Sequence, residues 1–182
     1  MSENVVFIGV GNMGNPMACN LKKAGKNVIV FDVSKEMIDK AIQSNLEVET
    51  DFEKLINPET SVVITMLPEG KHSKDVYLRD NGILDKVSKN CLLIDCSTID
   101  IETSKEIGRK ATEKDVKMID APVSGGVMGA QKATLNIMVG GSEDAFKKAL
   151  PILNLMGKNI YHAGEIGSCL LYTSDAADDL LC

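Results

Sequence analysis

Short runs of apolar, mostly β-branched residues alternate with amphipathic segments along most of the chain. Continuous apolar runs of this length are typical of strands that are buried on both faces, as in parallel sheets covered by helices. They predict strands at 5–8, 28–31, 62–66, 92–95, 118–120, 134–139 and 159–161. Strand and helix in repeated alternation predict an α/β fold, a doubly wound Rossmann-like domain with a mostly parallel sheet.

The segments between these runs carry helix signals. Met13, Met17 and Leu21 recur at helical spacing, with Pro16 in the opening turn and Gly25 at the end. The predicted helices cover 13–24, a segment starting at Ser34, a segment after Asp100, whose side chain can cap free amides, and 142–155. Residues 121–126, with two adjacent glycines, are expected to form a loop.

Composition narrows the class of protein. The 182 residues are 44% hydrophobic and 25% charged, the balance of an ordinary globular chain. Lys and Arg number 20 against 26 Asp and Glu, and the basic residues are scattered, so we expect no nucleic-acid or membrane partner. Five cysteines without CxxC spacing predict reduced thiols and no metal site. With no basic leader and no apolar run of about 18 residues, the chain is expected to be cytoplasmic.

The segment after the first predicted strand has the pattern G-x-G-x-x-G, formed by Gly9, Gly11 and Gly14 with Asn12 and Met13 between the last two. The first glycine permits a tight turn, the second lets the backbone approach a pyrophosphate, and the third lets the helix lie close to the strand. The amides and the positive end of the helix then face the phosphates. The motif and its position predict a dinucleotide site.

Asp32 ends the second predicted strand, eighteen residues beyond Gly14. This is close to the spacing of about 20 expected for the acidic residue that binds the adenosine ribose, and a carboxylate there repels a 2′-phosphate. The position therefore favours NAD over NADP. Two alternatives stay open: Asp32 could be a turn residue before a helix, and Lys35 could permit some NADP binding.

With these motifs in place, the sequence resembles the β-hydroxyacid dehydrogenase family. The similar segments are 9–18, 65–68, 94–100, 120–127, 138–141 and 156–160, and together they extend over positions 4 to about 167. The resemblance implies a cofactor-binding domain of this size followed by a second, all-helical domain that this chain does not contain. Many members of the family pair through that second domain, so a homo-oligomer of the full-length protein stays open.

The resemblance further implies site residues. Leu67 and Pro68 would lie along the cofactor and Thr98 near its nicotinamide, while Ser124, Gly125 and Gly126 would hold the substrate carboxylate. A serine hydroxyl with glycine amides can form an anion-binding nest. The alternatives are a helix-capping role for Thr98 and a plain tight turn at 124–126. His72 falls where some members of the family contact the cofactor, but is interpreted as a solvated residue at a helix start, and His162 as structural.

The activity implied by the resemblance is hydride transfer from a small 3-hydroxy acid, such as 3-hydroxyisobutyrate, to NAD. Two other functions stay open. One is a tartronate or succinic semialdehyde reductase that uses NADP, and the other is a non-catalytic module that binds NAD.

The chain departs from the family near its C-terminus, where Thr173 stands at the position of the family's catalytic lysine. A threonine hydroxyl has no cationic form with which to exchange a proton with the substrate alcohol, so no catalytic residue is expected in this chain. We divide the chain into a dinucleotide-binding domain at 1–167 and a tail at 168–182, which is expected to be unstructured or artefactual. On these grounds we expect the chain as given to be inactive.

Overall fold

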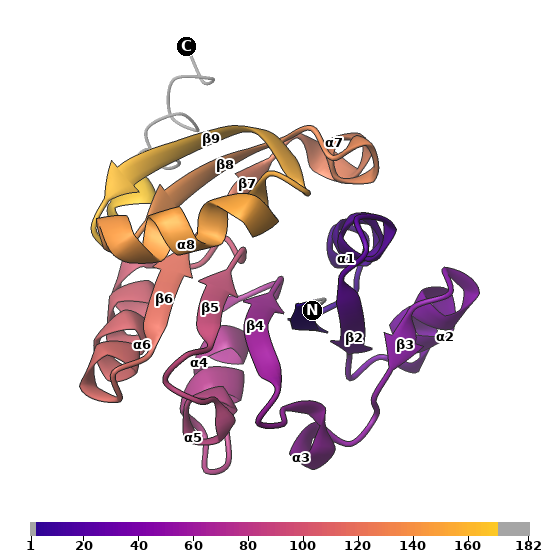
Figure 1. Cartoon of the computed structure of the whole chain (residues 1–182), viewed down its shortest axis with the longest axis horizontal. Coiled ribbons are helices and arrows are strands. Elements are labelled where there is room, and N and C mark those ends of the chain that lie inside the picture. The colour runs from indigo at the N-terminus through magenta and orange to yellow at the C-terminus, as the bar shows by residue number, and fades with distance from the viewer. Residues whose placement is uncertain (1–2, 171–182) are drawn as a thin grey trace.

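The computed structural model describes residues 3–170 of the chain. Its strands are β1 (Asn4–Ile8), β2 (Asn27–Phe31), β3 (Glu47–Val48), β4 (Thr60–Thr65), β5 (Leu92–Asp95), β6 (Lys117–Asp120), β7 (Val123–Ser124), β8 (Leu135–Gly140) and β9 (Gly157–Gly164). Its helices are α1 (Gly14–Lys23), α2 (Lys35–Gln43), α3 (Phe52–Leu55), α4 (Gly70–Leu78), α5 (Ile83–Lys86), α6 (Ile101–Glu113), α7 (Gly126–Lys132) and α8 (Glu143–Leu153). Figure 1 shows these elements around one sheet.

The strands form a sheet in the order β3-β2-β1-β4-β5-β6-β8-β7, with β9 paired to β8. From β3 to β6 all pairs are parallel, whereas β8 runs antiparallel to β6 and β7. The chain reverses its direction of travel across the sheet between β1 and β4. In open α/β sheets the crevice outside the carboxyl ends at such a switch point is where ligands bind.

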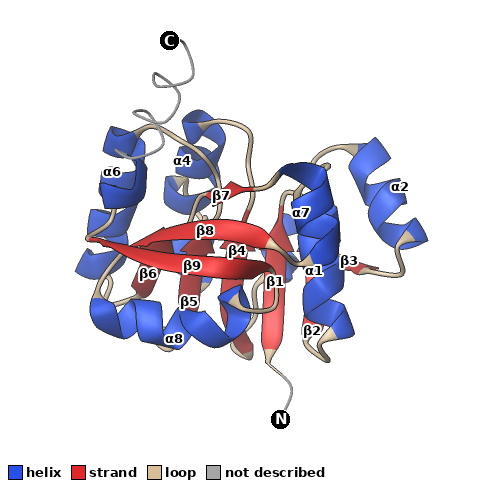
Figure 2. Cartoon of the chain, turned by 90° about the horizontal axis from the view of Figure 1, so that it is seen from above, coloured by secondary structure: helices blue, strands red, loops and turns tan. Residues whose placement is uncertain are grey.

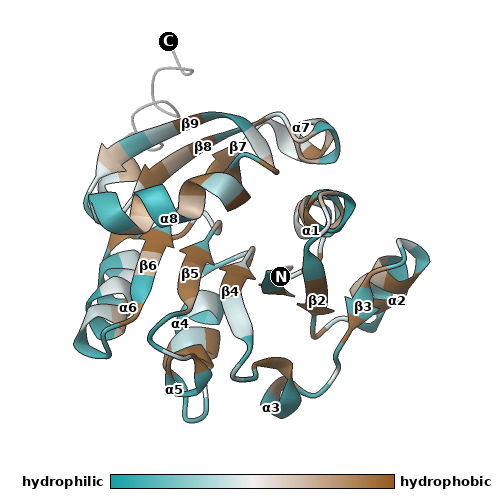
Figure 3. Cartoon of the chain, in the orientation of Figure 1, coloured by the Kyte–Doolittle hydropathy of each residue, from teal (hydrophilic) through white to brown (hydrophobic). Residues whose placement is uncertain are grey.

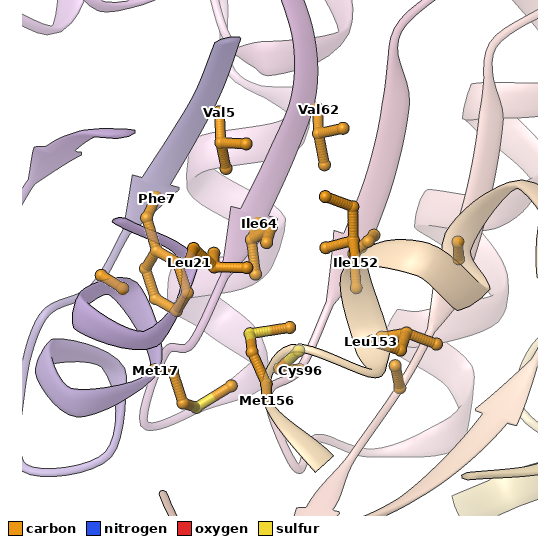
Figure 4. Packing of buried hydrophobic residues seen from close by; sticks show 14 of the residues in the cluster. Val5, Phe7, Met17, Leu21, Val62, Ile64, Cys96, Ile152, Leu153 and Met156 are labelled. Carbon is orange, nitrogen blue, oxygen red and sulfur yellow. The ribbon is translucent and has the colours of Figure 1, made fainter. Parts of the chain in front are cut away.

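Helices cover both faces of the sheet. In Figure 2, α4 and α6 lie on one side of the strands and α8 on the other. Successive residues of β1 alternate between the two cores: Val5 and Phe7 pack with residues of α1 and α8, while Val6 and Ile8 pack with residues of α4 to α6. In Figure 3 the central strand β5 is largely brown, whereas β9 at the edge of the sheet is partly teal, and Figure 4 shows the first of these cores.

The doubly wound fold predicted from the sequence is confirmed. Each predicted strand and helix is present, β5 with the predicted bounds and the others with ends shifted by a few residues. Asp100 caps α6 by accepting a hydrogen bond from the Thr103 amide at 2.8 Å, and Ser142 caps α8 in the same way through the Ala145 amide. No helix within residues 3–170 is long and apolar enough to cross a membrane.

The structure differs from expectation in two places. Residues 121–126 are not one loop, because Val123 and Ser124 pair with β8 as the short strand β7. The segment that begins at Ser168 was not expected to pack, yet Cys169 and Leu170 are buried, with the Cys169 thiol 2.7 Å from an Asp120 carboxylate oxygen. The remainder of that segment, including Thr173, lies outside the described residues.

Candidate functional site

The carboxyl ends of β1, β2 and β4 meet at the switch point of the sheet, around a cleft of about 450 Å³. The glycine-rich turn after β1 forms one wall. Asp32 and Val33 follow β2, and Leu67 and Pro68 follow β4. The fold thus brings together most of the predicted cofactor residues, from segments more than fifty positions apart.

Two glycines of the turn are required by packing. Gly9 has a φ of +91°, and a Cβ atom there would lie 2.3 Å from the carbonyl oxygen of Met66. A Cβ atom on Gly14 would lie 1.9 Å from the carbonyl oxygen of Gly9, so only glycine lets α1 approach β1 this closely. Packing therefore explains why both positions are glycine, and their contact with a cofactor stays a prediction.

Gly11 is different, because nothing in the fold requires a glycine there. A Cβ atom would have no neighbour within 4 Å, and the residue is not in the positive-φ region. Of the fifteen glycines, all within residues 3–170, it is the only one with neither a close neighbour nor a positive φ. The open space in front of Gly11 is what a closely approaching ligand would need.

Asp32 is both a turn residue and a wall of the cleft. One carboxylate oxygen accepts a hydrogen bond from the Val10 amide at 2.9 Å, and the other accepts one from the Ser34 amide at 2.8 Å. The first bond ties the end of β2 to the glycine-rich turn, and the second supports the start of α2. Since a carboxylate has about four lone-pair sites, two remain for ribose hydroxyls.

The N-terminus of α1 faces the same cleft. This helix has no side-chain cap at Met13 and no acidic residue in its first turn, while Lys22 and Lys23 occupy its last turn. Its positive end is therefore not neutralised by its own side chains. Together with the space at Gly11, this suits the negative charge of a pyrophosphate.

The loops after β4 and β5 are joined by a hydrogen bond. The Leu67 amide donates to the Ser97 hydroxyl at 2.8 Å, which places Thr98 next to the β4 loop. Thr98 is exposed and does not cap α6, because Asp100 does so, and it does not line the cleft. The helix-capping alternative for Thr98 is therefore wrong, and its predicted contact with the nicotinamide stays a prediction.

Helix α4 adds Asp75 and Val76 to the cleft, which sequence reasoning did not assign, and His72, for which contact with the cofactor was the alternative interpretation. His72, Asp75 and Val76 line it, and the Nδ1 atom of His72 is buried with no hydrogen-bond partner in the described part of the chain. His72 is thus not the solvated residue that the sequence suggested. Its position three residues into a helix that follows Leu67 and Pro68 is the signal that could have placed it here. His162, by contrast, is structural, since it stacks on Phe146 and contacts the Gly141 carbonyl oxygen.

The predicted substrate residues lie apart from this cleft, between β7 and α7. Ser124, Gly125 and Gly126 are all exposed, and the two glycines have φ values of +125° and +62°. The backbone conformation alone accounts for glycine at both positions. Among the described residues, no cluster of three metal-ligating side chains is present.

Comparison with known proteins gives these features a context. A family model described as the NAD binding domain of 6-phosphogluconate dehydrogenase matches residues 4–164. A 3-hydroxyisobutyrate dehydrogenase of Pseudomonas aeruginosa is 44% identical over 165 residues, which are 91% of this chain and 55% of that protein. An NAD-dependent L-serine dehydrogenase of the same organism is 40% identical over 166 residues, again 91% and 55%.

A solved structure is similar over nearly the whole chain. The 3-hydroxyisobutyrate dehydrogenase of Mycobacterium tuberculosis, solved with L-serine, superposes with a TM-score of 0.92 at 36% identity, over 99% of this chain and 60% of that one. The resemblance to β-hydroxyacid dehydrogenases is therefore confirmed. The chain spans little more than half the length of the curated relatives it matches.

Proposed function

Because this chain belongs to the family of NAD-binding domains of 6-phosphogluconate dehydrogenase, we propose that it binds NAD in the cleft at the switch point of its sheet. The observation that carries the proposal is Gly11, the glycine that neither packing nor backbone conformation explains. In this assignment the pyrophosphate lies against Gly11 and the N-terminus of α1. Asp32 accepts hydrogen bonds from the adenosine ribose, and Leu67 and Pro68 lie along the cofactor.

We further propose that the whole protein of which this domain forms part oxidises a small 3-hydroxy acid. The relatives support 3-hydroxyisobutyrate or L-serine, since both occur in their names. In both compounds the carboxylate is attached to the carbon next to the one that bears the alcohol. Bound NAD would supply the hydride acceptor. This chain would contribute the orientation of the cofactor, and Ser124, Gly125 and Gly126 would hold the substrate carboxylate through a hydroxyl and backbone amides.

The domain boundary and the location in the cell belong to the same proposal. Residues 1–167 would form the cofactor-binding unit, with the departure from the family beginning at 168, although Cys169 and Leu170 are buried as part of the same fold. Thr173, at the position of the catalytic lysine, lies outside the described residues, so the expectation that this chain is inactive stays a prediction. The cytoplasmic location and the pairing of the full-length protein also stay predictions.

A cofactor titration of the purified chain tests the proposal. We expect NAD to bind at least about tenfold more tightly than NADP, because Asp32 repels a 2′-phosphate close by. Asp32→Asn keeps the size of the side chain and removes its charge, so the preference should narrow to about threefold or less. Asp39→Asn makes the same charge change on the exposed surface of α2 and serves as the control. Equal affinity of the unaltered chain for NAD and NADP would contradict the assignment.

A further inference from the structure

A buried network of hydrogen bonds lies beneath the two loops that follow β4 and β5. Its centre is Asp95, the last residue of β5, which is 2% exposed. One carboxylate oxygen, Oδ1, accepts a hydrogen bond from the Thr65 hydroxyl at 2.8 Å and another from the Ser97 amide at 3.0 Å. The carboxylate therefore connects the ends of two neighbouring strands.

The network extends from Asp95 in two directions. Toward α4, the Tyr77 and Thr65 hydroxyl oxygens lie 2.9 Å apart, and Tyr77 is completely buried. Toward the cleft, the Ser97 hydroxyl accepts the hydrogen bond of the Leu67 amide. Three elements that are distant in sequence, α4, β4 and β5, thus meet at one carboxylate and reach the backbone of a residue that lines the cofactor cleft.

The ionisation of the network agrees with this arrangement. Burial raises the pKa of Asp95, and hydrogen bonds from Ser97 and Thr65 oppose that rise. Burial, followed by the charge of Asp95, raises the pKa of Tyr77, so the phenol stays neutral and remains a donor. No cation of the described chain forms an ion pair with Asp95. Burial of a carboxylate costs free energy unless hydrogen bonds compensate for the water that it loses.

The second carboxylate oxygen of Asp95 differs from the first in its hydrogen bonding. Oδ2 of Asp95 and the hydroxyl oxygen of Ser73, on α4, are both buried without a hydrogen-bond partner among the described residues. The Ser73 side chain nevertheless opposes the rise in the pKa of Asp95. An amide nitrogen in place of Oδ2 would therefore leave both hydrogen bonds at Oδ1 intact.

We propose that Asp95 is a positioning residue: by accepting hydrogen bonds at Oδ1 it holds the loops that carry Leu67 and Thr98 in the geometry of the cofactor cleft. The proposal rests on the assignment of that cleft to NAD. Asp95 itself is not among the residues that line the cleft, so it acts through Ser97 and Thr65. For this role Asp95 needs one oxygen that accepts hydrogen bonds, and it does not need its negative charge.

Amide hydrogen exchange of the cofactor-free chain tests this directly. In Asp95→Ala the Leu67 amide should exchange at least about tenfold faster after normalisation to the amides of β1, because Ser97 loses its anchor. In Asp95→Asn, which keeps an oxygen acceptor, the rate should stay within about threefold of the unaltered chain. If Asp95→Ala does not fold, Thr65→Val removes a hydroxyl that donates to Asp95 and should raise the same normalised rate by about threefold.

The control is Leu93→Ala, two residues earlier on the same face of β5 and buried in the core beside α4 to α6. It should destabilise the whole domain and accelerate all core amides together, leaving the normalised rate of Leu67 unchanged. The proposal is overturned if Asp95→Ala behaves like Leu93→Ala, or if Asp95→Asn exchanges as fast as Asp95→Ala. The first outcome would make Asp95 a merely structural residue, and the second would make its charge the required property.

A parallel titration separates this proposal from the function on which it rests. Asp95→Ala should bind NAD about tenfold more weakly, whereas Asp95→Asn and Leu93→Ala, at a temperature where both are folded, should match the unaltered chain. Failure of the unaltered chain to bind NAD would refute the proposed function. The exchange rates would still decide whether Asp95 positions the two loops.

Discussion

Two glycine-containing turns of this domain lead from a strand into a helix, and they are built differently. The turn from β1 to α1 is crowded. A Cβ atom added to Gly9 or Gly14 would lie closer to a backbone oxygen than Cβ atoms approach in real proteins. The turn from β7 to α7 is open and exposed, with Gly125 and Gly126 in positive-φ conformations. Packing accounts for Gly9 and Gly14 in the first turn, and backbone conformation accounts for both glycines in the second.

The difference shows what a structure without ligands can say about a binding turn. In the first turn, Gly11 has no structural reason to be glycine, so a ligand is the remaining physical reason. In the second turn both glycines are explained by φ, so its role in holding a carboxylate depends on the resemblance to relatives. Substitution by alanine distinguishes these reasons, because the added methyl group is costly only where space or conformation is limiting.

The largest effect is expected at Gly14. In Gly14→Ala the Cβ atom would lie 1.9 Å from the Gly9 carbonyl oxygen, so α1 must move away from β1. Overpacking of this kind should lower the free energy of unfolding by about 3 kcal/mol. Urea unfolding checks this: the midpoint concentration should fall, while the slope of the free energy of unfolding against urea concentration should stay unchanged. A loss below about 1 kcal/mol would mean that the helix and strand are not held together as the structure indicates.

An intermediate effect is expected at Gly126, where a Cβ atom would meet nothing within 4 Å but φ is +62°. Gly126→Ala should cost about 1 kcal/mol of stability, from the left-handed conformation alone. Gly126→Asn is the matched variant, because asparagine tolerates this conformation better, and it should recover part of the loss. Equal losses in the two variants would show that space and not conformation is limiting in this turn.

Much of this fold could be predicted from the sequence because its strands are buried on both faces and read as continuous apolar runs. The elements that were missed, β3, β7, α3 and α5, are two to four residues long, too short to show a periodicity. The longer α7 was also missed, and only a helix start at His72 was expected of α4. Its polar residues His72 and Lys74 interrupt an apolar stripe, and Ser73 and Tyr77 are buried through contacts that only the folded chain creates.

The candidate site was predictable where one local motif carries it and not where distant segments meet. Gly9, Gly14 and Asp32 lie where the spacing predicted, although the bonds from Asp32 to the Val10 and Ser34 amides required the structure. The role we propose for Asp95 could not be seen in sequence. Its partner Thr65 is thirty positions away, and nothing before folding shows that β4 and β5 are neighbours.

The smallest effect on stability is expected at Gly11, and it is the most informative one. Since no atom lies within 4 Å of the new methyl group and φ is not positive, Gly11→Ala should change the free energy of unfolding by less than about 0.5 kcal/mol. The methyl group nevertheless occupies the space that a pyrophosphate would need, so NAD should bind at least about tenfold more weakly, a loss of about 1.4 kcal/mol. Unfolding and titration of the same preparation separate the two effects. A Gly11→Ala chain that is stable and binds NAD with full affinity would leave this glycine without a function and remove the main support for the proposed site.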